Sequence, residues 1–192
     1  MNTIMRASLL MLLAMLPFAQ AYAADDEDYA KTLDVFKSAG ESSHYFGKSY
    51  GYALFPTIGK GGIGIGGARG TGRVYEQGRY IGDTTVTQLS VGFQFGGQAY
   101  SQIVFFEDKR ALDEFTGGNF EFGAQASAVA ITAGASATTS TTGTSAGASG
   151  GQHDATTVAT NFYKGMAVFT VAKGGLMYEA TVGGQKFSYK PR

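Results

Sequence analysis

Two short stretches of the sequence match the Gly-x-Ser-x-Gly pattern that holds the nucleophilic serine of many hydrolases. They are centred on Ser145 and Ser149, and His153 and Asp154 follow closely. A hydrolase needs that serine on a strained turn between a strand and a helix, with a histidine base in reach. Both stretches lie in a tract of Ser, Thr and Gly, where such matches arise from composition. We therefore rank an enzyme last among the possible functions, and loss of turnover in a Ser145→Ala variant would reverse that ranking.

Residues 62–67 match the GxGxxG pattern of dinucleotide-binding loops. That loop must follow a strand and open a helix, because the helix N-terminus holds the pyrophosphate. Here the glycines alternate with Ile63 and Ile65, as in a strand with one bare face. The chain has no cysteine, and its two histidines, His44 and His153, have unlike surroundings. We expect neither a cofactor nor a metal site.

Basic residues are better candidates for a functional site than the serine and glycine motifs. Between positions 48 and 83, five of them stand against two acidic residues. Arginine offers a planar fork that suits phosphate, and lysine offers a mobile point charge. One interpretation is a patch that faces anionic lipid head groups. The other is ordinary surface charge that protects strand edges and turns. The candidate lipid-binding residues are Lys60, Arg69, Arg73, Arg79 and Lys173.

One short sequence occurs twice in the chain, in the elements that must position these residues. Residues 51–63 read GYALFPTIGKGGI, and residues 165–176 read GMAVFTVAKGGL. Paired glycines allow the positive φ values of tight turns. We therefore predict that both copies share a hairpin geometry, with a strand, a tight turn that carries Lys60 or Lys173, and a second strand.

Other strands follow from alternation and turn residues. Residues 73–81 predict a hairpin that turns at Gln77 and Gly78. Apolar residues alternate with polar ones over 89–95, and a glycine pair at 96–97 leads into a strand over 98–106. That strand ends apolar on both sides, so another element must cover its outer face.

Helices are expected at the N-terminus and after residue 106. Acidic residues open a helix over 25–39 that Gly40 ends, and a short helix with an aromatic side is expected over 42–50. Asp108 is placed to cap a helix that covers the 98–106 strand and stops at Gly117.

The rest of the chain returns to strands. We expect one strand within 120–135 and several over 162–189, while residues 136–157 are too poor in apolar side chains to order and form a mobile loop. The fold class is therefore mainly β, a small antiparallel barrel or strongly curved sheet with about three helices outside.

The first 23 residues have the pattern of a secretory signal, with Arg6, an apolar run and a small-x-small site ending at Ala23. We expect cleavage there and a periplasmic or secreted product, residues 24–192, forming one domain. Its formal charge is 14 − 15 = −1. A near-neutral chain argues against nucleic acid as a partner.

Several ordered blocks of the sequence resemble the SYLF domain family. They are GYALFP at 51–56, KGGIGIGG at 60–67, QLSVGFQFGGQAYS at 88–101, IVFF at 103–106 and FGAQASA at 122–128. The resemblance covers residues 33–189. It implies a β-barrel core with helices outside, and a domain that in eukaryotes binds phosphoinositides and sometimes actin.

Two departures limit what the resemblance implies here. Eukaryotic members use a basic amphipathic helix at the start of the domain, whereas this chain opens with acidic residues at 25–28, and Gln125 stands where many relatives are acidic. Actin has no role for a protein exported from a bacterial-type cell. A weak preference for anionic phospholipid remains the leading hypothesis. The alternatives are an envelope protein that holds a protein partner and a barrel whose interior holds an acyl chain.

Overall fold

The computed structural model describes residues 25–63, 65–91, 98–123, 126, 128–131, 162, 164–173 and 182–192. The expected signal segment, the loop expected over 136–157 and the turn expected at 96–97 lie outside these residues. Within the described ranges, none of the helices has the length and hydrophobicity that a membrane span requires.

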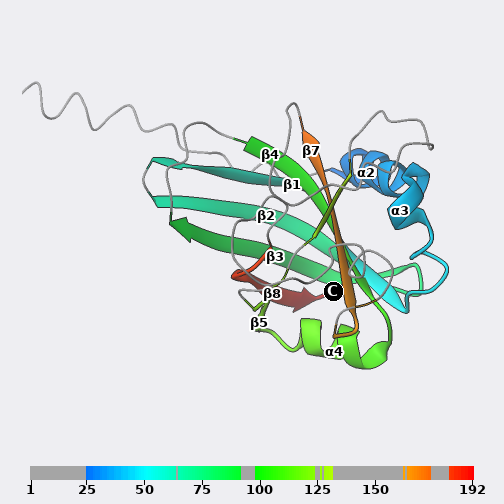
Figure 1. Ribbon diagram of the computed structural model, residues 1–192. Coiled ribbons are helices and arrows are strands. Elements are labelled where there is room, and N and C mark those ends of the chain that lie inside the picture. Colours follow the sequence, from blue (N-terminus) through cyan, green and yellow to red (C-terminus); the bar gives the residue numbers. More distant parts are fainter. Residues whose placement is uncertain are drawn as a thin grey trace, which may run out of the picture.

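Eight strands form one sheet that curls into a half-barrel (Figure 1). Seven of them pair antiparallel, in the order β5-β8-β3-β2-β1-β4-β7, and β6 adds parallel to β7. This confirms the expected fold class in its curved-sheet form. The strands are β1 (Gly51–Ile63), β2 (Ile65–Glu76), β3 (Arg79–Val91), β4 (Gln98–Phe106), β5 (Phe120–Glu121), β6 (Val129–Ile131), β7 (Met166–Lys173) and β8 (Gln185–Pro191).

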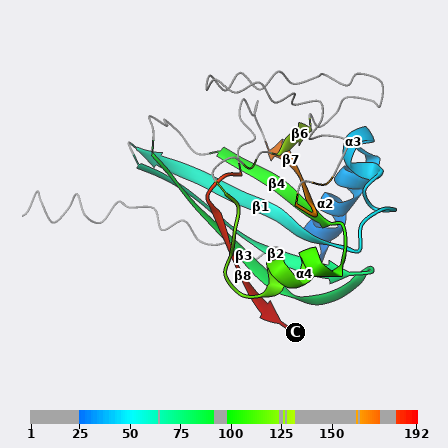
Figure 2. The same cartoon turned by 60° about the horizontal axis from the view of Figure 1, so that its bottom comes forward.

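The concave side of the sheet holds the larger core. Because side chains alternate along a strand, every second residue points inward. Helix α4 (Lys109–Thr116) closes one end of this side, and Asp108 caps it by accepting a hydrogen bond from the Ala111 amide. Its Phe115 contacts Phe106 of β4 and Phe187 of β8 at centroid distances of 4.9 Å each. Strands that are not neighbours in the sheet therefore meet through α4 (Figure 2).

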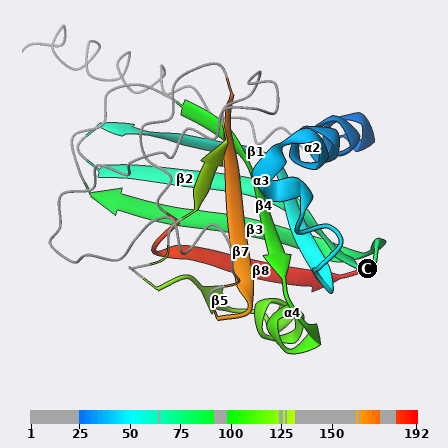
Figure 3. The same cartoon turned by 45° about the vertical axis from the view of Figure 1, so that its right-hand side comes forward.

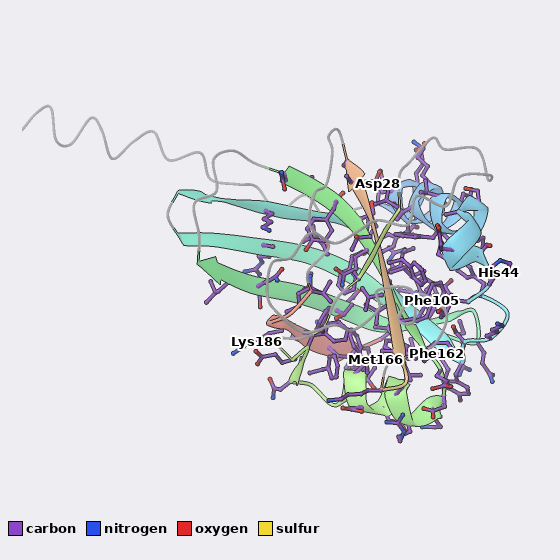
Figure 4. All side chains as sticks on the ribbon, viewed as in Figure 1. Asp28, His44, Phe105, Phe162, Met166 and Lys186 are labelled. Carbon is purple, nitrogen blue, oxygen red and sulfur yellow. The ribbon has the colours of Figure 1, made fainter. Side chains whose placement is uncertain are left out.

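A second core lies on the convex side, under α2 (Asp26–Ser38) and α3 (Gly40–Ser43). Figure 3 shows both helices on the same side of β1 and β4. Tyr45 stacks on Phe105 at 5.5 Å and meets Phe169 edge-on at 5.0 Å. The labelled Phe105 lies inside this layer in Figure 4, whereas His44 lies at the periphery. The ends of β1, β4 and β7 are thus buried on both faces, which explains the apolar run at residues 103–106.

The lysine hairpin predicted for the first copy of the phrase is wrong. β1 runs unbroken through Lys60, with a register shift between Leu54 and Thr57, and pairs with β2 as far as Ile63 and Ile65. These two isoleucines therefore belong to two paired strands and not to one. In the second copy Lys173 ends β7, and the turn and strand predicted after it lie outside the described residues. The hairpin predicted over 73–81 is confirmed, with positive φ at its two turn residues.

The repeated phrase does not mark equivalent positions. β1 and β7 both pair with β4, but Phe55 belongs to the concave core and its counterpart Phe169 to the convex core. β4 sets this difference, because Phe55 pairs with Gln102 and Phe169 with Ile103, one residue along. A shift of one residue turns every side chain to the other face.

The helix predictions hold in part. α2 and α4 form where expected. Gly40 begins α3 instead of ending α2, and α3 is shorter than the helix expected over 42–50. α4 covers the concave face of β4, while α2 and α3 cover the other face. The strand expected within 120–135 is two short strands, β5 and β6.

Candidate functional site

Beyond α2, the convex side of the sheet is exposed. We call this surface the open face, and its side chains come from β1, β2, β3 and β8. They are Thr57, Arg69, Thr71, Thr85, Thr87, Leu89, Lys186 and Ser188, which are exposed apart from the half-buried Thr85. Side chains alternate along each strand, so the apolar neighbours of these residues point to the concave side. Among the described residues, no element covers the outward-facing side chains, which are polar apart from Leu89.

Strand register arranges the open face in rows that cross the sheet. Thr57, Thr71, Thr85 and Ser188 are successive partners in one row, which we call the hydroxyl row. The next row, the basic row, runs from Lys173 through Ala99, Gly59, Arg69 and Thr87 to Lys186. Neighbouring strands lie about 4.8 Å apart. The basic row therefore sets three cations over six strands.

Two of the five predicted lipid-binding residues lie in the basic row. Arg69 is exposed at its middle and Lys173 is exposed at its β7 end. Two strands separate them, so the cations are roughly 14 Å apart at the backbone. The Lys173 ammonium donates to the Thr57 hydroxyl at 2.8 Å, which draws it toward the hydroxyl row.

Arg73 and Arg79 lie toward the other end of the sheet, where acidic residues neutralise them. Arg73 pairs with Asp26 of α2 at 2.6 Å. Arg79 pairs with Glu76 across the hairpin turn at 3.3 Å. Glu76 also accepts a hydrogen bond from the Tyr50 hydroxyl. Arg73 is only 23% exposed beside its carboxylate, and Arg79 lies at the hairpin turn away from the basic row, so neither residue adds to the positive charge of that row.

Lys60 lies on the opposite side of the sheet from the open face. It follows Ile58 by two positions in β1, and Ile58 belongs to the concave core. Side chains two apart on a strand share a face. The five predicted residues therefore do not form one patch.

Two residues of the open face escaped the sequence reasoning. Lys186 completes the basic row and pairs loosely with Glu121 at 3.5 Å, an exposed contact worth little; Figure 4 labels it at the outer edge of β8. Leu89 is 84% exposed in the register position beyond Thr87, next to the basic row. Its neighbour Gln88 is buried and donates to the Gly183 carbonyl at 2.9 Å, which reverses the facing that hydrophobicity alone predicts. Only strand pairing places these residues, so no sequence signal marks them.

Buried polar side chains inside the half-barrel stabilise the fold by hydrogen-bonding to one another. Gln102 and Gln185 are fully buried and exchange two hydrogen bonds, at 2.9 and 3.1 Å, across the concave side. The Gln185 amide also donates to the Tyr100 hydroxyl. Burial raises the pKa of Tyr100 to about 12, although the hydrogen bond from Gln185 opposes that rise. These groups satisfy one another, so they leave no reactive or ligand-seeking atom between them.

Catalytic and metal-binding arrangements are not seen in the described ranges. No group of three His, Cys, Asp or Glu side chains there lies close enough to hold an ion. His44 is exposed at the end of α3. Ser145, Ser149, His153 and Asp154 lie outside the described residues. On α4, Asp113 and Glu114 form the solvated face expected of them and pair with Lys109 and Arg110.

Comparison of the sequence with known proteins identifies a family and a relative. The family model described as "Ysc84: Las17-binding protein actin regulator" matches residues 87–190. A curated relative, "Beta cell expansion factor A" of Aeromonas veronii, is 24% identical over 164 residues, which cover 81% of this chain and 51% of that protein. This chain thus spans about half the length of that relative. The family match covers more than half of the chain and confirms the resemblance drawn from its ordered blocks, and we conclude that the chain belongs to the Ysc84, or SYLF, domain family.

Proposed function

We propose that this protein is a non-enzymatic module that attaches weakly to anionic phospholipid surfaces through its open face. The observation that carries the proposal is the basic row, in which register sets Arg69, Lys173 and Lys186 on one exposed side of the sheet. Membership of the Ysc84 family supports it. The signal-like pattern of residues 1–23 supports an exported protein that meets these lipids outside the inner membrane.

The expected binding free energy is modest. Each basic residue near an anionic surface contributes about 1 kcal/mol. Leu89 is largely exposed beside the basic row, and burying a leucine side chain contributes about 2 kcal/mol. Together these terms give about 5 kcal/mol, which corresponds to weak and reversible attachment. The electrostatic share falls as salt screens exposed charges.

Liposome flotation tests this proposal. We expect the protein to float with phosphatidylglycerol-containing vesicles at low salt, to be released at high salt, and to stay behind with pure phosphatidylcholine vesicles. Replacing Arg69, Lys173 and Lys186 together by glutamine removes about 3 kcal/mol and weakens binding about a hundredfold. Leu89→Ser also weakens binding at low salt, because it removes the apolar contribution.

A matched triple variant tests whether binding depends on the basic row or only on the total charge of the protein. Lys31→Gln, Arg79→Gln and Lys109→Gln remove the same formal charge from residues that already pair with nearby carboxylates. We expect this variant to float as the wild type does. Equal losses in the two triple variants would contradict a role for the open face. A protein that floats with neither vesicle would contradict the proposal as a whole and favour a protein partner in the envelope.

A further inference from the structure

A small cavity lies between α2 and the strands β2 and β3, next to the open face. Its volume is about 210 Å³, and its lining is Tyr29, Thr71, Gly72, Arg73, Asp83, Thr84 and Thr85. Sites for drug-sized ligands measure roughly 300–1,000 Å³. At about 30 Å³ of liquid volume per water, this cavity has the space of about seven waters. Its size suits a single small ring.

Aromatic rings hold the arginine of this cavity in place. The Arg73 guanidinium carbon lies 4.1 Å from the centroid of the Tyr29 ring and 5.0 Å from that of Tyr80. Asp26 binds the same guanidinium at 2.6 Å. The Arg73 side chain is only 23% exposed, so its hydrogen-bond donors keep a fixed direction. Stacking and ion pairing together orient hydrogen-bond donors without leaving a free positive charge.

Acceptors and hydroxyls face these donors. Asp83 is exposed, and its Oδ1 accepts a hydrogen bond from the Tyr80 hydroxyl at 2.5 Å. Among the described residues its Oδ2 has no hydrogen-bond partner. Thr71 and Thr85 are the middle members of the hydroxyl row and line the same cavity. An ionised carboxylate accepts strongly from hydroxyl donors.

The charges at the cavity select the kind of ligand. Of the residues that line the cavity, Arg73 contributes one positive charge and Asp83 one negative charge, so the lining has no net charge. A lining without net charge gives no electrostatic preference for phosphate or other anions, which the basic row would attract. A buried tyrosine wall, one oriented arginine, a carboxylate and two hydroxyls instead match a ring with hydroxyl groups on its edge and an apolar face.

We propose that this cavity binds one neutral sugar unit, with Asp83 and Arg73 on its hydroxyls and Tyr29 beside its ring. This role goes beyond attachment to lipid and uses different residues. The hydroxyl row continues from Thr71 and Thr85 to Thr57 and Ser188. Further units of a glycan chain would lie along that row.

An NMR titration tests the proposal. ¹⁵N-labelled protein, as purified from its expressing cells, is titrated with glucose, galactose, mannose and N-acetylglucosamine, and separately with inorganic phosphate. We expect saturable shifts of the Gly72 and Thr85 amides with at least one sugar, at roughly millimolar affinity, and none with phosphate. Asp83→Asn weakens binding at least about tenfold, because it removes a charged hydrogen-bond acceptor.

Asp113→Asn is the matched control, since it makes the same change on exposed α4, on the other side of the sheet. It should titrate as the wild type does. Asp83→Asn should still float with anionic vesicles, because Asp83 is not in the basic row. The proposal is overturned if no sugar produces saturable shifts, if phosphate produces them, or if Asp83→Asn binds sugar as tightly as the wild type.

Discussion

The amide pair of Gln102 and Gln185 should report directly on the curl of the sheet. β4 and β8 carry these residues, and three strands, β1, β2 and β3, separate them in the sheet order. Two hydrogen bonds between fully buried side chains nevertheless join them, at 2.9 and 3.1 Å. The contact exists only because the sheet bends round far enough to bring the two strands face to face.

Replacing both partners by leucine should cost no more than replacing one. Gln102→Leu leaves the buried Gln185 Oε1 without its donor, while Gln185 Nε2 still donates to the Tyr100 hydroxyl, and such an orphaned acceptor costs about 1–3 kcal/mol. We expect each single variant, Gln102→Leu or Gln185→Leu, to lose about 2 kcal/mol of unfolding free energy. The double variant buries two apolar side chains in place of the pair and leaves only the Tyr100 hydroxyl without its donor. It should also lose about 2 kcal/mol or less, which gives a coupling free energy of about 2 kcal/mol.

Urea unfolding followed by far-UV circular dichroism measures these values. The chain has no tryptophan, so the sheet signal itself is the suitable probe. Gln98→Leu is the matched control, because it makes the same change at an exposed position of β4 and should stay within about 0.5 kcal/mol of the wild type. Losses that add in the double variant, to about 4 kcal/mol, would show that the two amides do not meet and would refute the half-barrel geometry at this level.

Two further predictions concern close packing and alkaline pH. Gly72→Ala should cost about 2 kcal/mol in the same urea assay, because the new Cβ would lie 2.5 Å from the Phe55 ring, whereas Gly59→Ala, with open space at its Cβ, should be nearly neutral; equal stability of the two variants would contradict the packing on the concave side. Tyr100 has a pKa of about 12 in the folded protein and about 10 when unfolded, so its contribution to stability is complete below pH 10 and is lost as the pH rises from 10 to 12. Tyr100→Phe should be slightly less stable at pH 7, since it removes the hydrogen bond from Gln185, but its stability should fall less steeply above pH 10, by up to about 1.4 kcal/mol per pH unit. An unchanged slope in pH-dependent unfolding would show that Tyr100 ionises freely.

Local chemistry made much of the fold predictable. The hairpin at Gln77 and Gly78 follows from two turn residues that tolerate positive φ. α4 follows from an aspartate cap and three apolar residues on one side, and α2 from acidic residues at its first turn. Each signal lies within a few residues of the structure it specifies. The family was also readable from the chain, since ordered blocks of sequence identify it without any structure.

Long-range register decided the rest. Lys60 reads as a turn residue because glycines surround it, yet it lies within a strand that pairs on both edges. Leu89 reads as core and Gln88 as surface, but pairing with β2 and β8 sets them the other way round. No local sequence pattern shows which side of the sheet a residue faces, because a shift of one residue between paired strands turns every side chain to the other side.

Alternation, turn residues and caps act over short distances, so the amino-acid sequence alone implies a curved, mainly antiparallel sheet with helices packed against it. Strand pairing in the folded protein places Arg69, Lys173 and Lys186 in one exposed row and Arg73 and Arg79 beside carboxylates. Charge acts through space, and residues more than a hundred positions apart become neighbours only when the strands between them are paired.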